Sequence, residues 1–380
     1  MSVSKIEVME ERTIGRHFQA AALGVILGSL PLSLQDKILE GFEIGEIILE
    51  HNEASLIINN ITSILKTVCN VKRAAPTLYR AGRGDTRILS MLAPSLALKG
   101  SLCDWLIAIG QNVLQYANTS VPIPMFLRSY VFSKYRDVGE VEMTNAISLY
   151  SATAGAVISV IASDLRRGEA RYELYIVPDT SLESIRNSSR IYAILHAQAK
   201  GIRNLETYIR DLLRVESLSF ELTMLLSIAL FIYNVTTQVA GMPPLTGLYN
   251  VFEKFKIISV VPEQRPRVVW ERPLTLTYIF EELDRRGIMG ILLRLYWCAD
   301  HAVKYSESVT RAGDVVSQCV TALFAYIETK SLDQMLACVA NTQRLIDKFN
   351  YLCKSEGDKN ACNAERDFAV LNKDIVKLVA

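Results

Sequence analysis

A run of uncharged residues between Met143 and Ser163 constrains the fold more than any other part of the chain. With 21 residues, it is long enough to cross a lipid bilayer as a helix. Many of its positions, however, carry hydroxyl, amide or glycine residues, which make the run too polar to face lipid on every side. They include Thr144, Asn145, Ser148, Ser151, Thr153, Gly155 and Ser159. We therefore expect a helix that is buried inside protein.

The composition indicates extensive packing against other polypeptide. Half of the 380 residues are hydrophobic and 21% are charged, which is typical of helices covered on more than one face by other segments or by partner subunits. A chain of this length is expected to form two domains. The formal net charge of +1 gives no overall attraction for a polyanion, although arginine, which suits phosphate and interfacial ion pairs alike, outnumbers lysine by 25 to 16.

Cysteine usage predicts an intracellular protein. The seven cysteines are odd in number, have no CxxC spacing and lie mostly among apolar residues. This pattern is typical of reduced, buried thiols. The segment from Met1 to Arg16 is polar and rich in acidic residues, which is unlike a signal peptide. We therefore expect the protein to be cytoplasmic.

Helical periodicity covers most of the sequence. Helical patterns occupy residues 17–70 in three segments, 101–117, 217–235 and 274–380. The segment Arg171–Pro178 is the best strand, because it is rich in aromatic and β-branched residues and ends in proline. Three prolines between Val260 and Pro273 disfavour a helix and predict a linker or an extended arm.

These elements predict a predominantly helical α+β fold. We expect a mixed N-terminal domain over residues 1–260, with a small sheet set among helices, and a C-terminal helical bundle over residues 261–380. The alternative is a membrane-associated helical protein built on the apolar segments 143–163 and 222–235. The second segment has 14 residues, short of the roughly 20 that a span requires, so burial in a core fits better and we expect no membrane association.

Motifs for catalysis are missing from the sequence. There is no G-x-S-x-G, no Walker loop and no H-E-x-x-H, and the four histidines are scattered without partners at ligand spacing. We therefore expect no enzyme, no metal and no cofactor. An alternative is an enzyme with a scattered site, such as a nuclease that uses Asp164, Glu169 and Glu173.

The first candidate for nucleic-acid binding is a basic segment between residues 72 and 87. Its glycines let backbone amides approach phosphate, its cations neutralise phosphate, and Tyr79 is able to stack on a base. The candidate residues are Lys72, Arg73, Arg80, Arg83 and Arg87. A solvated loop that docks on the acidic first segment of the chain explains the same pattern.

The second candidate is a helix predicted from about Ile191 to Arg214. At 100° per residue, one narrow stripe of this helix is basic, whereas the far side is apolar. The stripe contains His196, Lys200, Arg203, Arg210 and Arg214. It would track a nucleic-acid backbone, or it would be a solvent-exposed face with ion pairs to Glu206 and Asp211.

The third candidate lies between Lys254 and Arg272, where cations outnumber acids around Trp270. Arg265 and Arg267 are its candidate contacts, because an extended basic arm with an aromatic residue is able to enter a groove. Linkers between domains have a similar composition.

Three segments resemble an archaeal CRISPR-associated family, the large subunit of subtype I-A surveillance complexes. They are Tyr172–Pro178, Leu218–Leu226 and Leu323–Glu328, and the similarity in order and texture extends over roughly residues 165–350. The resemblance assigns no role to individual residues, so the candidate contacts named above depend on basic patterning alone.

The resemblance implies a non-catalytic subunit that lies beside the guide RNA. Such a subunit helps to recognise the short motif flanking a DNA target and stabilises strand opening, while base pairing reads the sequence. The implied partners are the backbone and small subunits of the effector complex, the guide RNA and the target DNA.

Overall fold

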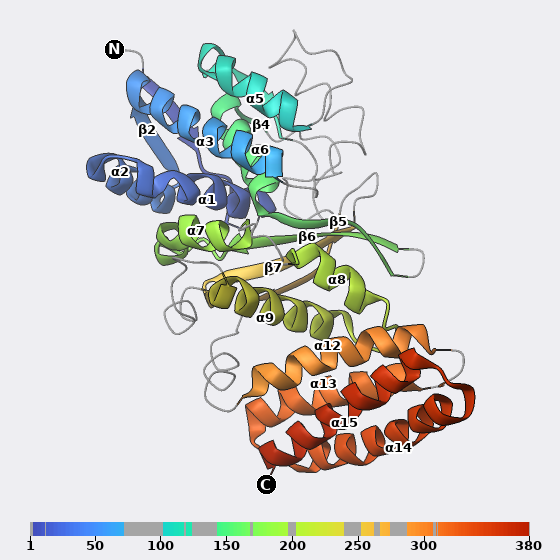
Figure 1. The fold of residues 1–380 in the computed structure, drawn as a ribbon. Helices are drawn as coiled ribbons and strands as arrows, with labels where there is room; N and C mark the ends of the chain where they lie inside the picture. The colour runs from blue at the N-terminus through green and yellow to red at the C-terminus, as the bar shows by residue number, and fades with distance from the viewer. Residues whose placement is uncertain are drawn as a thin grey trace. The chain divides into compact units, whose positions relative to one another are not determined.

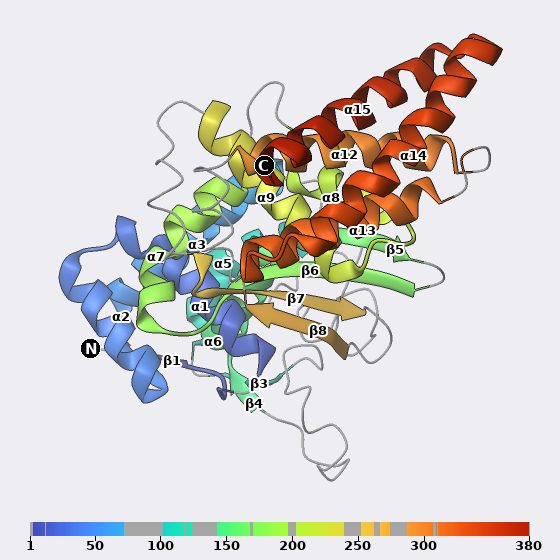
Figure 2. The same cartoon turned by 90° about the horizontal axis from the view of Figure 1, so that it is seen from below.

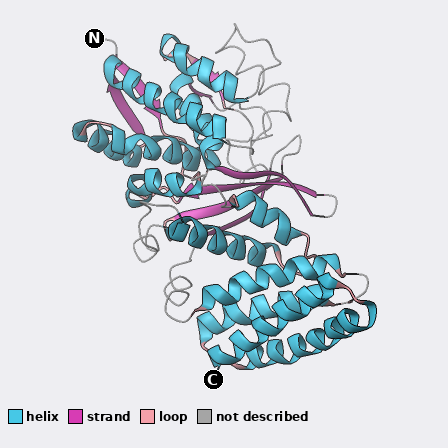
Figure 3. Cartoon of the chain, viewed as in Figure 1, coloured by secondary structure: helices cyan, strands magenta, loops and turns pink. Residues whose placement is uncertain are grey.

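The structure is a computed structural model. It describes residues 3–11, 13–71, 102–117, 119–123, 143–167, 170–196, 203–238, 252–261, 267–273, 287–306, 309 and 311–379. Helices dominate and the strands form small antiparallel sheets, which confirms the predicted α+β class (Figures 1 and 3).

The chain divides into two compact units. We call them the mixed unit (Met1–Ala197 with Val251–Leu274) and the helical unit (Gln198–Asn250 with Thr275–Ala380). This division differs from the predicted boundary after residue 260, because the chain leaves the mixed unit near residue 198 and returns to it for residues 251–274.

The mixed unit contains a helical layer and three small sheets. In chain order, its elements are β1 (Val3–Glu7), α1 (Ile14–Ile26), α2 (Leu32–Ile44), β2 (Glu46–Glu50), α3 (His51–Val71), α5 (Leu102–Asn112), β3 (Ser120–Pro122), β4 (Met143–Asn145), α6 (Ala146–Ser159), β5 (Val160–Arg167), β6 (Ala170–Pro178), α7 (Leu182–Leu195), β7 (Phe255–Val261) and β8 (Arg267–Pro273). The helices α1, α2 and α3 confirm the three helical patterns predicted between residues 17 and 70.

Helix α1 is the centre of the mixed unit, and two glycines set its distance from its neighbours. A Cβ atom on Gly155 of α6 would overlap the carbonyl group of Phe18 in α1. A Cβ atom on Gly24 of α1 would lie 2.5 Å from the carbonyl oxygen of Ile185 and 2.6 Å from Cβ of Ser188, both in α7. No side chain fits at either contact, so α1 packs backbone-close against α6 and α7.

The uncharged run from residue 143 to 163 is largely buried, as predicted, with Met143 exposed at its start, but only its middle is helical. It forms β4, then α6, then the start of β5, and all 14 residues of α6 are buried. The buried polar side chains form hydrogen bonds within the protein. The side-chain oxygen of Asn145 accepts a hydrogen bond from Ser148 N at 2.9 Å, and the hydroxyl of Thr153 donates to Leu149 O at 2.8 Å. Such pairing removes most of the cost of burying polar groups.

Among the residues that the structure describes, no helix is both long enough and apolar enough to span a bilayer. The second apolar segment lies in α9 (Phe220–Gln238), where Met224, Leu226 and Ile228 to Ile232 are buried.

The four-stranded sheet has the order β5-β6-β7-β8 and is antiparallel throughout (Figure 2). Strand β6 confirms the strand predicted at 171–178. The linker or arm predicted at 260–273 is wrong, because β7 and β8 form a hairpin. Pro273 is the last residue of β8, a position where a missing N–H costs no ladder bond in the middle of a strand, and Pro262 and Pro266 lie outside the described residues.

The helical unit ends in a helical bundle, and its four described helices begin at Ile288, later than the predicted start at residue 261. The bundle consists of α12 (Ile288–Lys304), α13 (Ala312–Thr329), α14 (Asp333–Glu356) and α15 (Lys359–Val379), and α8 (Leu205–Leu213) and α9 pack on α12 (Figure 1). The buried face of α13 is apolar and includes Val316, Val320 and Leu323, which have no exposed surface. Stacked rings of Phe349 and Phe368, 5.5 Å apart, join α14 to α15.

Six of the seven cysteines form disulfides, so the prediction of reduced thiols is wrong for them. The pairs are Cys69–Cys103 between α3 and α5, Cys319–Cys338 between α13 and α14, and Cys353–Cys362 between α14 and α15. Cys298 in α12 is a free, buried thiol, and burial raises its pKa. The spacing of cysteines along the sequence does not show which of them meet when helices pack.

Replacement of Gly155 by alanine tests the contact between α1 and α6. We expect it to lower the free energy of unfolding of the mixed unit by about 3 kcal/mol, because the methyl group forces the backbones apart. Gly28→Ala is the matched control, since a Cβ atom there has no neighbour within 4 Å. Chemical denaturation measures both variants, and equal stability of the two proteins would contradict the close contact.

Thiol counting tests the disulfides. In denaturant without reductant, one thiol per chain should react with a thiol reagent, and all seven should react after reduction. Reduction should also lower the melting temperature, because each cross-link contributes about 2–4 kcal/mol by restricting the unfolded chain. Seven reactive thiols in the unreduced protein would contradict the pairing.

Candidate nucleic-acid interface

Most of the basic residues proposed from sequence lie outside the described part of the chain. Lys72, Arg73, Arg80, Arg83, Arg87, Lys200 and Arg265 are among them. Arg267 is the first residue of β8, but its side chain is likewise outside what the structure describes. The first and third candidates of the sequence analysis therefore stay predictions, and only the second can be placed in the fold.

The single helix predicted from Ile191 to Arg214 is wrong. Helix α7 ends at Leu195, and α8 begins at Leu205 after Asn204, whose side chain accepts a hydrogen bond from Thr207 N at 2.8 Å. His196 belongs to the mixed unit, where its Nε2 contacts the carbonyl oxygen of Ile158 at 2.9 Å. The 100° spacing holds only within one helix, so residues on either side of the break do not share a face. The basic stripe predicted from His196 to Arg214 is therefore not continuous.

Two of the remaining arginines are engaged by carboxylates of the same unit. Arg210 reaches Glu206 Oε1 through Nη2 at 2.6 Å and Nε at 3.0 Å, one helical turn away. Arg203 reaches Asp211 Oδ2 at 3.0 Å through Nη1. These ion pairs, to Glu206 and Asp211, are the ones expected if the basic face of α8 is a solvent-exposed face neutralised by acids of the same helix. A phosphate would have to displace these carboxylates to bind Arg203 or Arg210.

A tyrosine reinforces the ion pair of Arg203. Tyr296 of α12 donates its hydroxyl hydrogen to Asp211 Oδ2 at 2.5 Å and accepts a hydrogen bond from Arg203. Burial, aided by the negative charge of Asp211, raises the pKa of Tyr296, so the phenol keeps its proton at neutral pH. Tyr208 packs edge-on against the same ring, with centroids 5.2 Å apart. This network fastens α8 to α12 and leaves Arg203 a structural residue.

Arg214 differs from the other two because it lines a groove. It is exposed at the C-terminal end of α8, and the groove beside it has a volume of about 300 Å³. Arg311 lines the same groove from the residue before α13, where its backbone is left-handed at φ 75° and its side chain makes no capping hydrogen bond. Among the residues that the structure describes, neither guanidinium has an ion pair or a side-chain hydrogen bond.

The groove also contains acids. Glu216 and Asp314 line it together with the two arginines, so their formal charges cancel. The net charge of the groove would therefore attract an anion only weakly. An anion in this groove would be held by directed hydrogen bonds from the two guanidinium groups.

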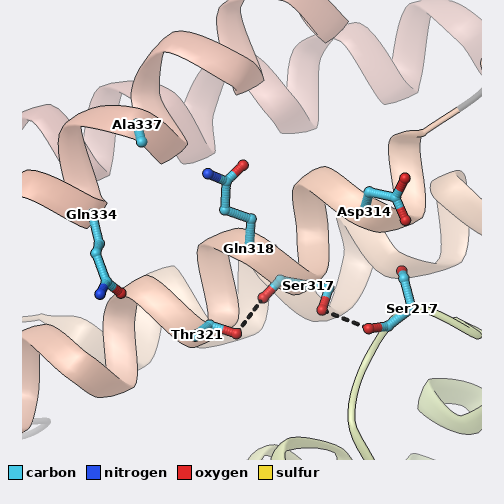
Figure 4. A pocket seen from close by; sticks show the side chains of 7 residues that line it. All are labelled: Ser217, Asp314, Ser317, Gln318, Thr321, Gln334 and Ala337. Atoms are coloured by element: carbon cyan, nitrogen blue, oxygen red, sulfur yellow. Dashed lines mark hydrogen bonds between the residues drawn. The ribbon is translucent and has the colours of Figure 1, made fainter.

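A second depression, of about 370 Å³, continues from the first, because Ser217 and Asp314 line both. Its other lining residues are Ser317, Gln318, Thr321, Gln334 and Ala337 from α13 and α14 (Figure 4). The hydroxyl of Ser317 donates to Ser217 O at 2.8 Å, which fixes the turn after α8 against α13. The depression offers uncharged donors and acceptors along one side of α13. We call the two depressions together the α13 groove.

Sequence reasoning found Arg214 but missed Arg311. The helical periodicity that pointed to Arg214 assumes one continuous helix from Ile191 to Arg214, and the structure breaks that helix between α7 and α8. Arg311 stands alone between apolar and small residues, and no local pattern indicates that the chain folds it back beside residue 214. Only the packing of α13 against the turn at residues 214–217 brings the two together.

Metal ligands do not converge within the described residues, where no three histidine, cysteine or acidic side chains are placed to hold an ion. Of the alternative nuclease residues, Asp164 is exposed within β5. Glu173 is fully buried and accepts a hydrogen bond from Tyr175 at 2.6 Å, and Glu169 lies outside the described residues.

Comparisons with known proteins give no relatives: no protein-family model, no curated protein and no solved structure matches the chain.

Proposed function

We propose that this protein is a non-catalytic large subunit of a CRISPR RNA-guided DNA surveillance complex, in which the helical unit holds a nucleic-acid strand by its backbone. The observation that carries the proposal is the α13 groove, where Arg214 and Arg311 stand beside a row of hydroxyls and amides. Guanidinium forks suit phosphates, and hydroxyls and amides suit sugars and base edges. Contacts to the phosphate and sugar groups position a nucleic-acid strand without recognising its base sequence. This suits a complex in which base pairing with the guide RNA recognises the sequence.

The resemblance to the subtype I-A large subunit supports the architecture of this proposal. The three similar segments lie in β6, at the start of α9 and in α13, which are core elements of the two units. A similarity carried by core residues speaks for a shared fold and says little about shared contacts. The functional part of the proposal therefore depends on the groove.

The charge distribution limits the mode of binding. With a net charge of +1 and with Arg203 and Arg210 paired internally, the chain lacks the strong positive field of a protein that collects nucleic acid from solution. In this proposal, the partner subunits and the guide RNA bring the strand to the groove. The large subunit then adds a few short-range contacts that hold the flank and the opened strand.

The three disulfides restrict where such a complex operates. Disulfides are rare in the cytosol of mesophiles, whereas intracellular proteins of hyperthermophilic archaea and bacteria are rich in them. The proposed cytoplasmic location and the archaeal resemblance are compatible with the disulfides only in a host of the second kind. We therefore propose a thermophilic host, in which cross-links between α13, α14 and α15 keep the bundle and its groove intact at high temperature.

Substitution of Arg214 and Arg311 by glutamine tests the groove. We expect the double variant to bind single-stranded DNA on the order of tenfold more weakly at moderate salt, because two phosphate contacts are lost. The slope of the logarithm of affinity against the logarithm of salt concentration should fall by about 1.4, at 0.7 for each phosphate contact on a single strand. Fluorescence anisotropy with a labelled oligothymidylate measures both quantities on the full chain.

The double variant Arg210→Gln with Lys304→Gln is the matched control, since it removes the same formal charge from exposed side chains that are already paired one helical turn away. It should bind within about twofold of the unmodified protein. Equal weakening in the two double variants would mean that only total charge matters, and unchanged affinity in the Arg214 and Arg311 variant would overturn the groove assignment.

A further inference from the structure

The end of the β5–β6 hairpin places two arginines directly opposite each other. Arg166 of β5 and Arg171 of β6 are partners in the antiparallel register. Side chains at such positions lie on the same face of the sheet with Cβ atoms about 5 Å apart, and like charges there are destabilising. An anion between the two guanidiniums, either from the chain or from a ligand, offsets this repulsion.

Among the described residues, one carboxylate lies near the two guanidiniums. Asp164 Oδ1 lies 3.7 Å from Arg171 Nε and 3.9 Å from Arg166 Nε. Both distances exceed the range of a hydrogen bond, so the carboxylate attracts the two cations without filling their donor sites. Within the described residues, neither guanidinium makes a hydrogen bond, and each side chain is 62% exposed.

A β-bulge holds Asp164 at this position. Two residues of β5, Ser163 and Asp164, stand opposite the single residue Glu173 of β6, between the paired positions Ala162 and Leu165. Asp164 has a left-handed backbone with φ 52°, a conformation that few residues other than glycine, asparagine and aspartate adopt readily. Bulges commonly redirect a side chain, and this one places the carboxylate between the arginines.

The paired arginines lie beyond the rest of the sheet. Among the described residues, the pairing of β6 with β7 begins at Glu173, the part of β6 that carries Arg171 pairs with β5 alone, and the hairpin continues as a two-stranded ribbon (Figure 1). A ribbon of this kind is narrow and reachable from both faces.

We propose that Arg166 and Arg171 form a second site for the phosphodiester backbone of nucleic acid, with Asp164 as an internal anion that keeps the site preorganised when it is empty. One phosphate between two guanidinium forks receives the charge-assisted hydrogen bonds that Asp164 is too distant to make. This inference builds on the proposed function but concerns residues of the mixed unit, which are separate from the α13 groove.

Substitutions of opposite sign test this site on the full chain. Arg166→Gln with Arg171→Gln should weaken binding of labelled oligothymidylate on the order of tenfold and lower the salt slope by about 1.4. Asp164→Asn should strengthen binding about threefold, because it removes the competing charge, and asparagine accepts the left-handed backbone. Thermal melting should show all variants folded.

The control is Arg186→Gln with Arg190→Gln, which removes two exposed arginines of α7 from the same unit. Its affinity should stay within about twofold of the unmodified protein. The inference is overturned if this control weakens binding as much as the hairpin variant, or if the hairpin variant binds normally. It is also overturned if polyglutamate competes as well as unlabelled DNA. Loss of binding in the Arg214 and Arg311 variant alone would leave the proposed function standing and remove only the hairpin site.

Discussion

The structure depends on the approach of α1 to the helices on either side of it. Gly155 and Gly24 remove the side chains that would separate α1 from α6 and α7, and nearly all of α1 and the whole of α6 are buried as a result. The absence of charge between residues 143 and 163 follows from this packing, since a charged side chain on α6 would have no solvent to reach. The four-stranded sheet begins where α6 ends, so the position of the β5–β6 hairpin also follows from this contact.

Pairing decides which arginines are available for a ligand. Arg203 and Arg210 are located where a helical wheel would place phosphate contacts, yet each is committed to a carboxylate one or two turns away. Arg214 and Arg311 are brought together by the packing of α13, and Arg166 and Arg171 by strand register. The net charge of +1 is therefore a poor guide to local chemistry, because it does not show which cations are paired with a carboxylate and which face a groove or the end of a ribbon.

Sequence patterns predicted the buried elements well and the junctions poorly. Strand β6, helix α6 and the buried face of α13 follow from local composition and periodicity. The break between α7 and α8 was missed because apolar and basic residues keep a helical spacing across residues 196–204, and the capping role of Asn204 is a weak signal by comparison. The hairpin β7–β8 was missed because the prolines between Val260 and Pro273, which disfavour a helix, predicted a linker or an extended arm, whereas Pro273 ends a paired strand. The disulfides and Arg311 depend on which helices meet, which no local pattern contains.

Purification of the tagged full-length chain from its native host tests the central claim most directly. If the protein is the large subunit of a surveillance complex, it should elute with several other proteins and with RNA of uniform length, and sequencing of that RNA should reveal one repeat-derived end shared by many different guide sequences. Recovery of the chain alone, or with proteins but no RNA, under conditions that keep assemblies intact would contradict the claim.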